Sequence, residues 1–439
     1  MKVVVLGGGS SGEHFAGALR RLDADVEIAL VERRLVGGEC SYWACMPTKT
    51  MLRGPEVTSA AHRTPGVSGV KLDPAAVFAW RDVVAGRDDS SQVEWLKDKR
   101  CELVRGEAEV VRPGLIRVGG QELAYDRLVI ATGSSPAIPE LPGLEGSGFW
   151  TNVDATETTE VPPRLLVLGG GPVGCELAQF FARVGSKVTL VQMGPRILPR
   201  VDAEAAGLVA ESLAEDGVQI VLDAKATAVD NGTLALLDGR RLHFDRLLLA
   251  TGRKPNLGGL EPLGLTMNPG GIEVNEQMRA ADNVWAIGDV TGIAPFTHVG
   301  KYHGRIAAYD IAGRETRADH RAIPATIFTD PQVATVGTLE GGTIASWQLT
   351  ATPRLSTYER PKRSGFVKIA ADPEKRVVTG AVAVGPEAGE WLQQLTLAIR
   401  AETPIDVLLD VIQPYPTFSE AVFLALRELG LDLLPAGSS

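Results

Sequence analysis

Residues 2–12 read KVVVLGGGSSG and residues 164–174 read RLLVLGGGPVG, so the same pattern occurs twice in the chain. Each copy is a short apolar run followed by a glycine turn, a stretch with helical periodicity and a second apolar run. The glycines permit a tight turn and let the backbone approach a pyrophosphate at a helix N-terminus, where unpaired N–H groups favour anions. One such motif is weak evidence, but two in the same strand-turn-helix setting predict two dinucleotide-binding units.

The residue that ends the second strand distinguishes the two units. Glu32 ends the strand of the first unit and is the acid expected to bind a ribose 2′-hydroxyl. Gln192 stands at the matching place in the second unit, with Arg196 and Arg200 close behind it. Because a carboxylate there would repel a 2′-phosphate, its absence favours NADP(H) over NAD(H) at the second site. The first site suits an unphosphorylated ribose.

A further repeat closes both units. Residues 128–133, LVIATG, recur as residues 247–252, LLLATG, and predict a strand and a small-residue turn beside a bound dinucleotide. Residues 284–289, VWAIGD, predict another buried strand, and Asp289 at its end can accept hydrogen bonds from a polyol chain. From about residue 321 the pattern becomes that of a compact α+β domain, with strands at 325–336, 365–371 and 377–384 before helices at 390–400 and 419–429.

The sequence therefore predicts an α/β protein with two Rossmann-like dinucleotide-binding domains and a C-terminal α+β domain. At about 150 residues per domain, a length of 439 residues also suggests three domains. The expected boundaries are 1–150 for the first nucleotide domain, 151–275 for the second, 276–320 for a segment that returns to complete the first, and 321–439 for the C-terminal domain.

Charge and composition exclude several classes of protein. Forty-four Lys and Arg against 54 Asp and Glu give a net charge of −10, which is unlike the basic footprint of a nucleic-acid binder. No apolar run approaches the roughly 20 residues of a membrane span, and the N-terminus reads as a first strand, not as a signal peptide. We expect a cytoplasmic protein that binds neither nucleic acid nor membrane.

Residues 37–49, GGECSYWACMPTK, place two of the four cysteines, Cys40 and Cys45, close together. In a reducing compartment, two cysteines this close in the sequence are either metal ligands or a redox pair. A zinc site needs four ligands at suitable spacing, which the chain lacks, so we expect a redox pair and no metal site. Five residues span about 8.6 Å of an ideal helix, whereas a disulfide needs about 4.4–6.8 Å, so a bridge requires a distorted helix or one that is just starting. At a helix N-terminus the pair would have stabilised thiolates. Cys101 and Cys175 read as small buried hydrophobic residues.

These motifs resemble those of the FAD-dependent pyridine nucleotide–disulfide oxidoreductases, the family of dihydrolipoamide dehydrogenase, glutathione reductase and mercuric reductase. The similarity covers essentially the whole chain, from the glycine motifs and residues 40–49 to the Ala-Thr-Gly turns, Gly288-Asp289 and residues 328–331, FTDP. It implies one FAD and one NAD(P)H per subunit, with FAD in the first domain, and a homodimer whose active site is shared across the C-terminal domain. Hydride would pass from nicotinamide to flavin, then to a Cys40–Cys45 disulfide, then to an acceptor.

The resemblance also implies roles for single residues. Cys45 would lie against the flavin as the charge-transfer thiolate, and Cys40 would face the substrate. Lys49 matches a lysine beside the flavin N5, with Glu176 as its carboxylate partner, and a cation there stabilises the electron density of a reduced flavin. The residues expected to contact one of the two nucleotides are Gly7, Gly9, Ser10, Ser11, Gly12, Glu32, Arg33, Gly38, Glu39, Lys49, Ala108, Thr132, Gly133, Ser134, Gly169, Gly171, Val173, Gly174, Gln192, Arg196, Gly252, Arg253, Gly288, Asp289, Phe296 and Thr297.

One departure separates the chain from the family's disulfide reductases. Those carry a His-Pro pair followed by a Glu near the C-terminus, whereas residues 415–420 read YPTFSE and no histidine follows His320. Tyr415 thus stands at the histidine position, with Glu420 retained, and we expect both to be catalytic, Tyr415 facing the partner subunit's Cys40. A phenol of ordinary pKa about 10 is a poor base at neutral pH, whereas an imidazole near about 6.5 is well matched. Mercuric reductases resemble this chain in carrying tyrosine there, but they also carry a C-terminal cysteine pair that residues 434–439, LPAGSS, lack.

The leading hypothesis is an NAD(P)H-dependent flavoprotein that reduces a non-standard acceptor, such as a metal ion, a quinone-like compound or a specialised metabolite. The alternative is a true disulfide or dihydrolipoamide-type reductase in which Tyr415 or water handles protons. A third hypothesis is a nucleotide-sensing flavoprotein that turns over little. Cys40, Cys45, Lys49 and Glu176 argue against sensing, because a sensor needs no redox pair.

Overall fold

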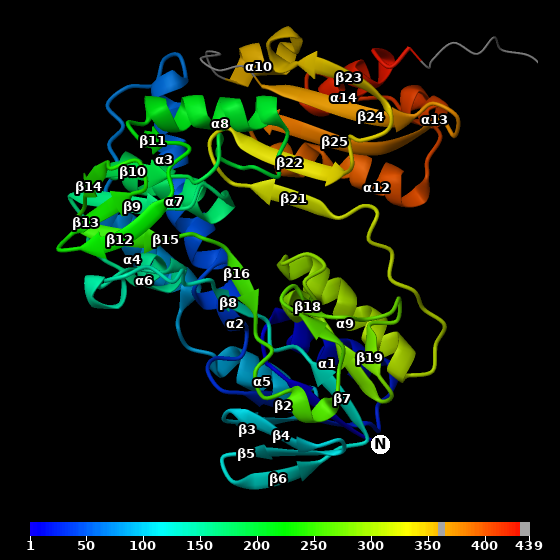
Figure 1. Cartoon of the computed structure of the whole chain (residues 1–439). Helices are drawn as coiled ribbons and strands as arrows, with labels where there is room; N and C mark the ends of the chain where they lie inside the picture. Colours follow the sequence, from blue (N-terminus) through cyan, green and yellow to red (C-terminus); the bar gives the residue numbers. More distant parts are fainter. Residues whose placement is uncertain (359–364, 431–439) are drawn as a thin grey trace, which may run out of the picture. The chain divides into compact units, whose positions relative to one another are not determined.

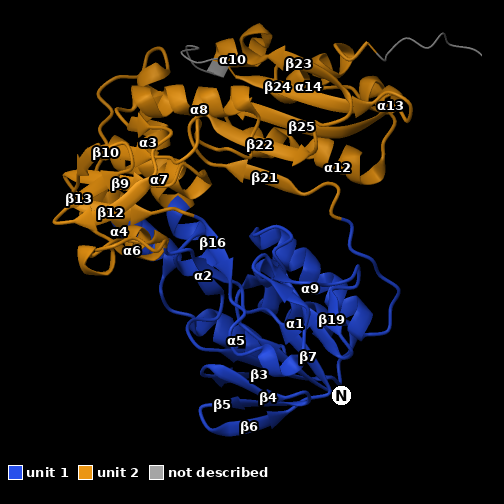
Figure 2. Cartoon of the chain, viewed as in Figure 1, with its two compact units in different colours: residues 1–48, 79–138, 252–319 blue, residues 49–78, 139–251, 320–439 orange. Residues whose placement is uncertain are grey.

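The computed structural model describes residues 1–358 and 365–430, and the residues divide into two compact units (Figure 2). Unit 1 comprises residues Met1–Thr48, Ala79–Ile138 and Gly252–Asp319. Unit 2 comprises Lys49–Phe78, Pro139–Thr251 and the chain from His320 onward. The last residues of the expected C-terminal domain, 431–439, lie outside the described residues.

Unit 1 is built on a six-stranded sheet of order β19-β20-β7-β1-β2-β3 (Figure 1). Its strands are β1 (Lys2–Leu6), β2 (Glu27–Glu32), β3 (Cys101–Arg105), β7 (Arg127–Ile130), β19 (Arg279–Ala281) and β20 (Val284–Ala286). All neighbours are parallel except β19 and β20. Parallel sheets are covered on both faces, and Val3, Val4 and Val5 of the central strand are accordingly fully buried.

The remaining elements of unit 1 cover or extend this sheet. They include α1 (Ser10–Leu22), α2 (Gly38–Tyr42), α5 (Ser90–Asp98), α9 (Thr297–Ile311), the small sheet of β4 (Ala108–Arg112), β5 (Leu115–Val118) and β6 (Gln121–Ala124), the pair β8 (Ser134–Pro136) and β16 (Arg253–Pro255), and the pair β17 (Met267–Asn268) and β18 (Gly271–Ile272). Helices α3 (Cys45–Arg63) and α4 (Pro74–Ala85) each contain a boundary between the units. The segment 279–286, far along the chain, supplies two strands to the N-terminal sheet.

Unit 2 contains a second parallel sheet, of order β11-β10-β9-β15, that repeats the plan of the first. Its elements are β9 (Arg164–Leu168), α7 (Pro172–Arg183), β10 (Lys187–Val191), α8 (Ala203–Glu215), β11 (Gln219–Val221), β15 (Arg246–Leu249) and the preceding helix α6 (Asn152–Glu157). Its small antiparallel sheet has β12 (Ala226–Asp230), β13 (Thr233–Leu236) and β14 (Arg241–His243). The internal repeat expected from the two glycine motifs is therefore also a repeat of strand order.

The C-terminal part of unit 2 is a five-stranded antiparallel sheet with helices, of order β21-β22-β25-β24-β23. The strands are β21 (Pro324–Ile327), β22 (Gln332–Gly337), β23 (Thr343–Gln348), β24 (Phe366–Asp372) and β25 (Val377–Gly385), and the helices are α10 (Pro353–Tyr358), α11 (Ala388–Trp391), α12 (Gln393–Ala401), α13 (Ile405–Asp410) and α14 (Ser419–Arg427). Buried residues of β22, β23, β24 and β25 and of α11, α12 and α14 form one hydrophobic core. The predicted mixed α/β fold with a C-terminal α+β domain is confirmed.

Three details of the predicted C-terminal elements are wrong. The run 325–336 is two strands, because the Asp330 N–H donates to Gln179 at 2.8 Å and the Asp330 carbonyl accepts from Gln179 at 3.1 Å, which takes this stretch out of the ladder. The run 390–400 divides into α11 and α12 at Leu392. Strand β23 has no counterpart among the predicted elements.

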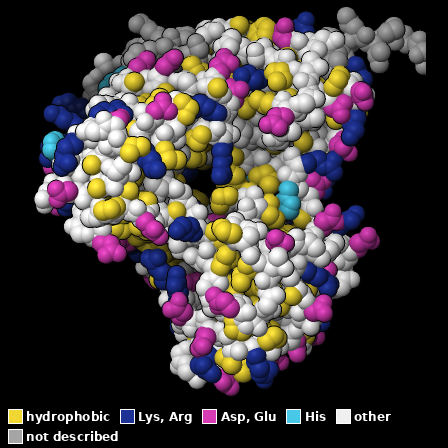
Figure 3. Space-filling model, in the orientation of Figure 1, with side chains coloured by type: hydrophobic (Ala, Val, Ile, Leu, Met, Phe, Trp, Pro, Cys, Tyr) yellow, Lys and Arg dark blue, Asp and Glu magenta, His cyan; other side chains and the backbone are white. Residues whose placement is uncertain are grey.

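Charged side chains of both signs are interspersed over the face shown in Figure 3, with hydrophobic side chains between them. The net charge of −10 is thus not gathered into one acidic patch on that face. Within the described residues, none of the helices combines the length and the hydropathy needed to cross a bilayer.

Both glycine turns depend on the same close approach of two strands. Gly7 has φ +110°, and a Cβ added to it would lie 2.2 Å from the carbonyl oxygen of Ala131 on the neighbouring strand end. Gly169 has φ +116°, and its Cβ would lie 2.3 Å from the carbonyl oxygen of Ala250. Only glycine fits either position, because the conformation is left-handed and the space is closed.

We predict that Gly174→Ala destabilises the protein and that Gly171→Ala does not. A Cβ on Gly174 would lie 1.9 Å from the Gly169 carbonyl oxygen, whereas a Cβ on Gly171, whose φ is −79°, meets no atom within 4 Å. The overpacked variant should lose roughly 1–3 kcal/mol of unfolding free energy. Denaturant unfolding followed by circular dichroism measures the difference, and equal stability of the two variants would contradict it.

Candidate active site

Cys40 and Cys45 lie on two different helices of the chain. Cys40 is in α2, whose last turn is closed by the Trp43 N–H donating to the Glu39 carbonyl at 2.8 Å, and Cys45 is the first residue of α3. The break between the helices meets the geometric requirement of a just-starting helix. The two side chains are thiols that hydrogen-bond to each other, which is the dithiol form of the predicted pair.

The two sulfurs also lie at the N-terminal end of α9. Cys45 Sγ is 3.5 Å from Thr297 Oγ1, and the same hydroxyl hydrogen-bonds to Cys40. Thr297 is the first residue of a 15-residue helix, and a helix N-terminus favours negative charge. Hydrogen bonding to Cys45 and burial raise the pKa of Cys40, while Thr297 and the charge of Lys301 act in the opposite direction. The Thr297 hydroxyl, the charge of Lys301 and the start of α9 are thus the groups that would stabilise a thiolate at this site.

Four of the predicted residues form one polar network in unit 1. Arg253 donates through Nη2 to the carboxylate of Glu39, through Nε to Ser134 Oγ at 2.7 Å and through Nη2 to the Ser134 carbonyl at 2.7 Å. Ser134 Oγ in turn donates to Asp289 Oδ2 at 2.6 Å. Ser134 and Asp289 come together because they follow the neighbouring parallel strands β7 and β20, whose carboxyl ends share one edge.

The strand-end residues Glu32 and Gln192 occupy equivalent positions. Glu32 Oε2 accepts from the Gly8 N–H at 2.8 Å, and Gln192 Oε1 accepts from the Gly170 N–H at 2.9 Å. Glu32 can offer only acceptors, whereas Gln192 keeps an NH₂ group that donates. The Arg196 guanidinium donates hydrogen bonds to the backbone carbonyls of residues 198, 199 and 201, all in its own loop. These hydrogen bonds do not direct the side chain toward a ligand.

The glycine turns fit the phosphates of a dinucleotide. Gly9 and Gly171 cap α1 and α7 with ordinary φ values of −71° and −79°, and neither helix start has a side-chain cap. A Cβ on Gly9 would meet nothing closer than 3.8 Å, and a Cβ on Gly171 nothing within 4 Å. Protein packing therefore does not require glycine there, and its small size leaves the N–H groups of the first helical turn open to a ligand.

A second cluster, in unit 2, joins Lys49 to Glu176. Lys49 Nζ donates to Glu176 Oε2 at 2.7 Å, and Glu176 Oε1 accepts from the Phe328 N–H at 2.9 Å. Lys49 Nζ also lies 4.8 Å from the centre of the Phe328 ring. Glu176 is only 4% exposed, so its charge is balanced locally by Lys49. Lys49 follows Cys45 by four residues on α3, which places the two on one side of that helix.

The structure places Tyr415 and Glu420 around the start of α14. Tyr415 is 71% exposed on the segment that precedes this helix, and Glu420 is in its first turn. Among the described residues, nothing donates a hydrogen bond to the buried Glu420 Oε2. A buried carboxylate oxygen normally accepts a hydrogen bond, so the described residues of one chain lack the donor that Glu420 Oε2 would be expected to have.

The other predicted nucleotide residues occupy turns and helix starts that follow strands of the two parallel sheets, or lie on short elements nearby in the sequence. Thr132 Oγ1 donates to the Asn256 carbonyl at 2.8 Å, and the Phe296 ring stacks on His298 with centroids 5.2 Å apart. Arg33 makes an exposed ion pair of 3.1 Å with Glu107. The predicted residues not yet placed lie at the starts of α1, α2, β4 and α7 and in the turns after β1, β7, β15 and β20: Ser10, Ser11, Gly12, Gly38, Ala108, Gly133, Val173, Gly252 and Gly288.

Sequence reasoning missed Asn256 and Lys301. Asn256 donates to the Thr132 carbonyl at 2.8 Å and accepts from Ser135 at 2.8 Å, and so holds the turn after β7. Lys301 follows Thr297 by four residues on α9. The i,i+4 spacing was the available signal for Lys301, whereas nothing local marks Asn256, whose partners are more than a hundred residues away.

Cys101 and Cys175 are 5% and 0% exposed, as expected for buried hydrophobic residues. Within residues 1–358 and 365–430, no group of three or more His, Cys, Asp or Glu side chains could hold a metal ion.

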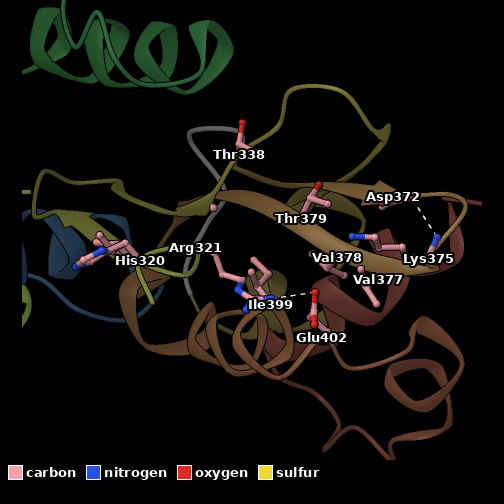
Figure 4. A pocket seen from close by; sticks show the side chains of 12 residues that line it. His320, Arg321, Thr338, Asp372, Lys375, Val377, Val378, Thr379, Ile399 and Glu402 are labelled. Carbon is pink, nitrogen blue, oxygen red and sulfur yellow. Dashed lines mark hydrogen bonds and ion pairs between the residues drawn. The ribbon is translucent and has the colours of Figure 1, made fainter. Parts of the chain in front are cut away.

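A cavity of about 450 Å³ lies in the C-terminal sheet region, and its lining contains none of the predicted site residues (Figure 4). Its lining includes Arg321, which pairs with Glu402 at 2.9 Å, and Asp372, which accepts from the Lys375 N–H at 3.0 Å. The lining contains neither cysteine nor any of the glycine turns, so the cavity has no part in the predicted redox chemistry.

Two family models together match nearly the whole chain. The model described as pyridine nucleotide-disulphide oxidoreductase matches residues 1–315, and the model of that family's dimerisation domain matches residues 323–426. The chain belongs to this family. It is therefore a flavin-dependent oxidoreductase, and FAD is the flavin that the family supports.

Individual relatives also match nearly the whole of this chain. A mercuric reductase of Staphylococcus aureus is 33% identical over 451 residues, covering 97% of this chain and 82% of the relative. A dihydrolipoyl dehydrogenase of Thermus scotoductus is 32% identical over 456 residues, covering 97% of each chain. The crystal structure of LpdA from Mycobacterium tuberculosis superposes with a TM-score of 0.88 at 26% identity, covering 98% of this chain and 99% of that one. These oxidoreductases act on different substrates, so family membership alone leaves the acceptor open.

We predict that Glu176→Ala lowers the unfolding free energy by roughly 2–4 kcal/mol, because it leaves the Lys49 ammonium and the Phe328 N–H without their acceptor. Glu176→Gln should cost less, since an amide oxygen can still accept from the Phe328 N–H. Denaturant titration compares the two variants. An alanine variant as stable as the glutamine variant would show that the buried carboxylate does not hold this cluster together.

Proposed function

We propose that the chain is an NAD(P)H-dependent FAD oxidoreductase that passes electrons through the Cys40–Cys45 pair to a non-standard acceptor, such as a metal ion, a quinone-like compound or a specialised metabolite. The observation that carries the proposal is the position of both thiols beside Thr297 at the start of α9. Closing the pair to a disulfide releases two electrons and two protons, and reduction reverses this. Bound FAD would supply the two-electron transfer between nicotinamide and this pair.

The residues of the chain have separate tasks in this proposal. The turns that begin α1 and α7 bind the pyrophosphates, and Glu32 orients the adenosine ribose of FAD. Asp289, held by Ser134, orients the ribityl chain. Cys45 stands beside the flavin, Cys40 meets the acceptor, and Lys49, fixed by Glu176, supplies a cation for the reduced flavin. The proposed domains remain 1–150 for FAD, 151–275 for NAD(P), 276–320 as the segment that returns to the FAD domain, and 321–439 for the interface.

We infer a homodimer in which Tyr415 and Glu420 complete the partner subunit's site. Three observations support it: the match to a dimerisation domain over residues 323–426, the 71% exposure of Tyr415, and the buried Glu420 oxygen without a partner among the described residues. Tyr415 in place of a histidine favours an acceptor that needs no imidazole base. The cytoplasmic location expected from the sequence stays a prediction.

A true disulfide or dihydrolipoamide-type reductase is the second candidate, favoured by the 32% identity to a dihydrolipoyl dehydrogenase over nearly the whole chain. A steady-state screen with lipoamide, glutathione disulfide, quinones, metal ions and oxygen separates the candidates. Rapid reduction of lipoamide or glutathione disulfide by the unmodified protein would promote this second candidate over the first.

The cysteine assignment predicts opposite spectra for two variants. Cys40→Ser should leave Cys45 as a thiolate beside the flavin, so a long-wavelength charge-transfer band should appear in the oxidised protein. Cys45→Ser should keep FAD bound but never show the band on reduction, because the donor is gone. Cys101→Ser, at a buried cysteine outside the pair, is the matched control. Anaerobic NADPH titration should deliver four electrons to the unmodified protein, and uptake of only two would favour a flavoprotein sensor without a working pair.

We propose a preference for NADP(H), supported by the donor NH₂ of Gln192 where Glu32 has a carboxylate in the first unit. Gln192→Glu should then raise the KM for NADPH and lower that for NADH, since a carboxylate repels a 2′-phosphate and binds a ribose hydroxyl. Flavin reduction by each nucleotide in stopped flow measures the change. Undiminished use of NADPH by the variant would contradict the preference.

A further inference from the structure

The four residues between the two cysteines, SYWA at 41–44, include two aromatic side chains that are buried. Tyr42 is 2% exposed and Trp43 is 6% exposed. Their ring centres are 5.5 Å apart, with the ring planes tilted by 59°. The two rings therefore pack inside unit 1, and they have almost no surface with which to meet an acceptor.

Both rings attach the end of α2 to the loop of residues 33–36 that precedes this helix. The Tyr42 hydroxyl donates to the Val36 carbonyl at 2.8 Å. Burial raises the pKa of Tyr42 to about 12, so the hydroxyl keeps its proton at neutral pH and remains a donor. The Arg34 guanidinium lies over the Trp43 ring, 3.8 Å from its centre, and the face of an aromatic ring attracts a cation. We call Tyr42 and Trp43 the aromatic anchor.

The loop to which the aromatic anchor attaches is itself held by several contacts. The Val36 N–H donates to Asp89 at 2.7 Å, and Asp89 pairs with Arg105. Arg105 also donates to the Arg34 carbonyl, and the Arg34 N–H donates to Glu32 Oε1 at 2.7 Å. Val36 is fully buried. The loop is thus tied to the end of β2, to β3 and to the start of α5, and it forms a fixed support for α2.

The position of α2 decides how near Cys40 lies to Cys45. Cys40 is in α2, whereas Cys45 begins the next helix, so no continuous helix holds the two at a fixed separation. A helix of five residues is too short to be stable by its own backbone hydrogen bonds. A Cβ on Gly37 would lie 3.0 Å from Tyr42 Cε2, so the Tyr42 ring also packs on the turn that begins α2. Side-chain contacts therefore have to hold this helix in place.

We propose that Tyr42 and Trp43 are positioning residues that fasten α2 to residues 33–36, hold Cys40 near Cys45 and thereby stabilise the disulfide relative to the dithiol. The inference rests on the proposed function, because it takes the pair to cycle between these two forms. A disulfide keeps the sulfurs together by its own covalent bond. The dithiol keeps them together only while α2 is held, so loosening α2 adds conformational freedom to the dithiol alone. Loss of the aromatic anchor should therefore make the pair harder to oxidise.

The equilibrium of the pair with dithiothreitol tests the proposal. The holoprotein is equilibrated anaerobically with mixtures of reduced and oxidised dithiothreitol, its thiols are blocked with N-ethylmaleimide, and the blocked cysteines are counted by mass spectrometry. When the protein is oxidised, the S–S bond of the reagent breaks and the Cys40–Cys45 bond forms. Two electrons and two protons pass from the protein to the reagent. The quantity measured is the equilibrium constant of this exchange, and flavin absorption shows separately that the flavin stays oxidised.

The variants should lower this constant to different degrees. Trp43→Leu should lower it about tenfold, which is a shift of about 30 mV toward a more positive reduction potential. Tyr42→Phe keeps the ring and removes only the hydroxyl, and it should lower the constant about threefold. Arg34→Met removes only the cation over the Trp43 ring and should also lower it about threefold. Because Arg34 acts through that ring, adding Arg34→Met to Trp43→Leu should give little further shift.

Trp150→Leu is the matched control. Trp150 also lies beside an arginine, with Arg246 5.8 Å from its ring centre, but both residues belong to unit 2. This variant should leave the equilibrium constant unchanged, because it loosens neither α2 nor residues 33–36. A constant lowered as much in Trp150→Leu as in Trp43→Leu would overturn the proposal, since the shift would then reflect a general loss of packing.

An equilibrium constant that is unchanged in Trp43→Leu and Tyr42→Phe would also overturn the proposal. If Trp43→Leu does not fold, Tyr42→Phe and Arg34→Met decide the outcome in the same measurement, because each removes one polar contact and leaves the packing in place. The proposed function fails separately, if the unmodified protein forms no disulfide between the two cysteines at any ratio of oxidised to reduced dithiothreitol.

Discussion

The carbonyl oxygens of Ala131 and Ala250 lie so close to Gly7 and Gly169 that no side chain fits between them. This contact fixes where the first strand of each parallel sheet ends and where the following helix begins. The N–H groups of both helix starts consequently open at the carboxyl edge of a sheet, beside a strand-end Glu32 or Gln192. The same edge in unit 1 receives Ser134 and Asp289 from neighbouring strands, so one steric constraint places the nucleotide turn and the polar network together.

The spacing of the two redox cysteines depends on a different feature, the break between helices α2 and α3. Had α2 continued into α3, the two cysteines would be too far apart for a disulfide, since five residues of helix span about 8.6 Å. The chain instead ends one helix after Tyr42 and begins the next at Cys45. The start of α9 then approaches from a distant part of the sequence, and Thr297 contacts both sulfurs. The N-terminal ends of α3 and α9 therefore both lie at the cysteine pair, and helix N-termini stabilise thiolates.

The fold by itself does not identify the substrate of this chain. The mercuric reductase and the dihydrolipoyl dehydrogenase each match 97% of this chain, yet they act on different substrates. The features that can separate such enzymes are side chains around a common frame: Tyr415, at the position where the resemblance gives disulfide reductases a histidine, and Gln192, where the first unit has Glu32. None of these changes the strand order, because each lies on a loop or an exposed helix face.

The sequence by itself determined the family, the two nucleotide units and the cysteine pair, because glycine turns and strand periodicity act over a few residues. It also predicted the residues of the Glu39–Arg253–Ser134–Asp289 network singly, but not that they join. Only the tertiary structure decided that these four residues join and that Asn256 holds the turn after β7, since these contacts link segments more than a hundred residues apart. The split of 325–336 into two strands had the same origin: the backbone of Asp330 bonds to the Gln179 side chain of a distant helix, and no local pattern encodes that.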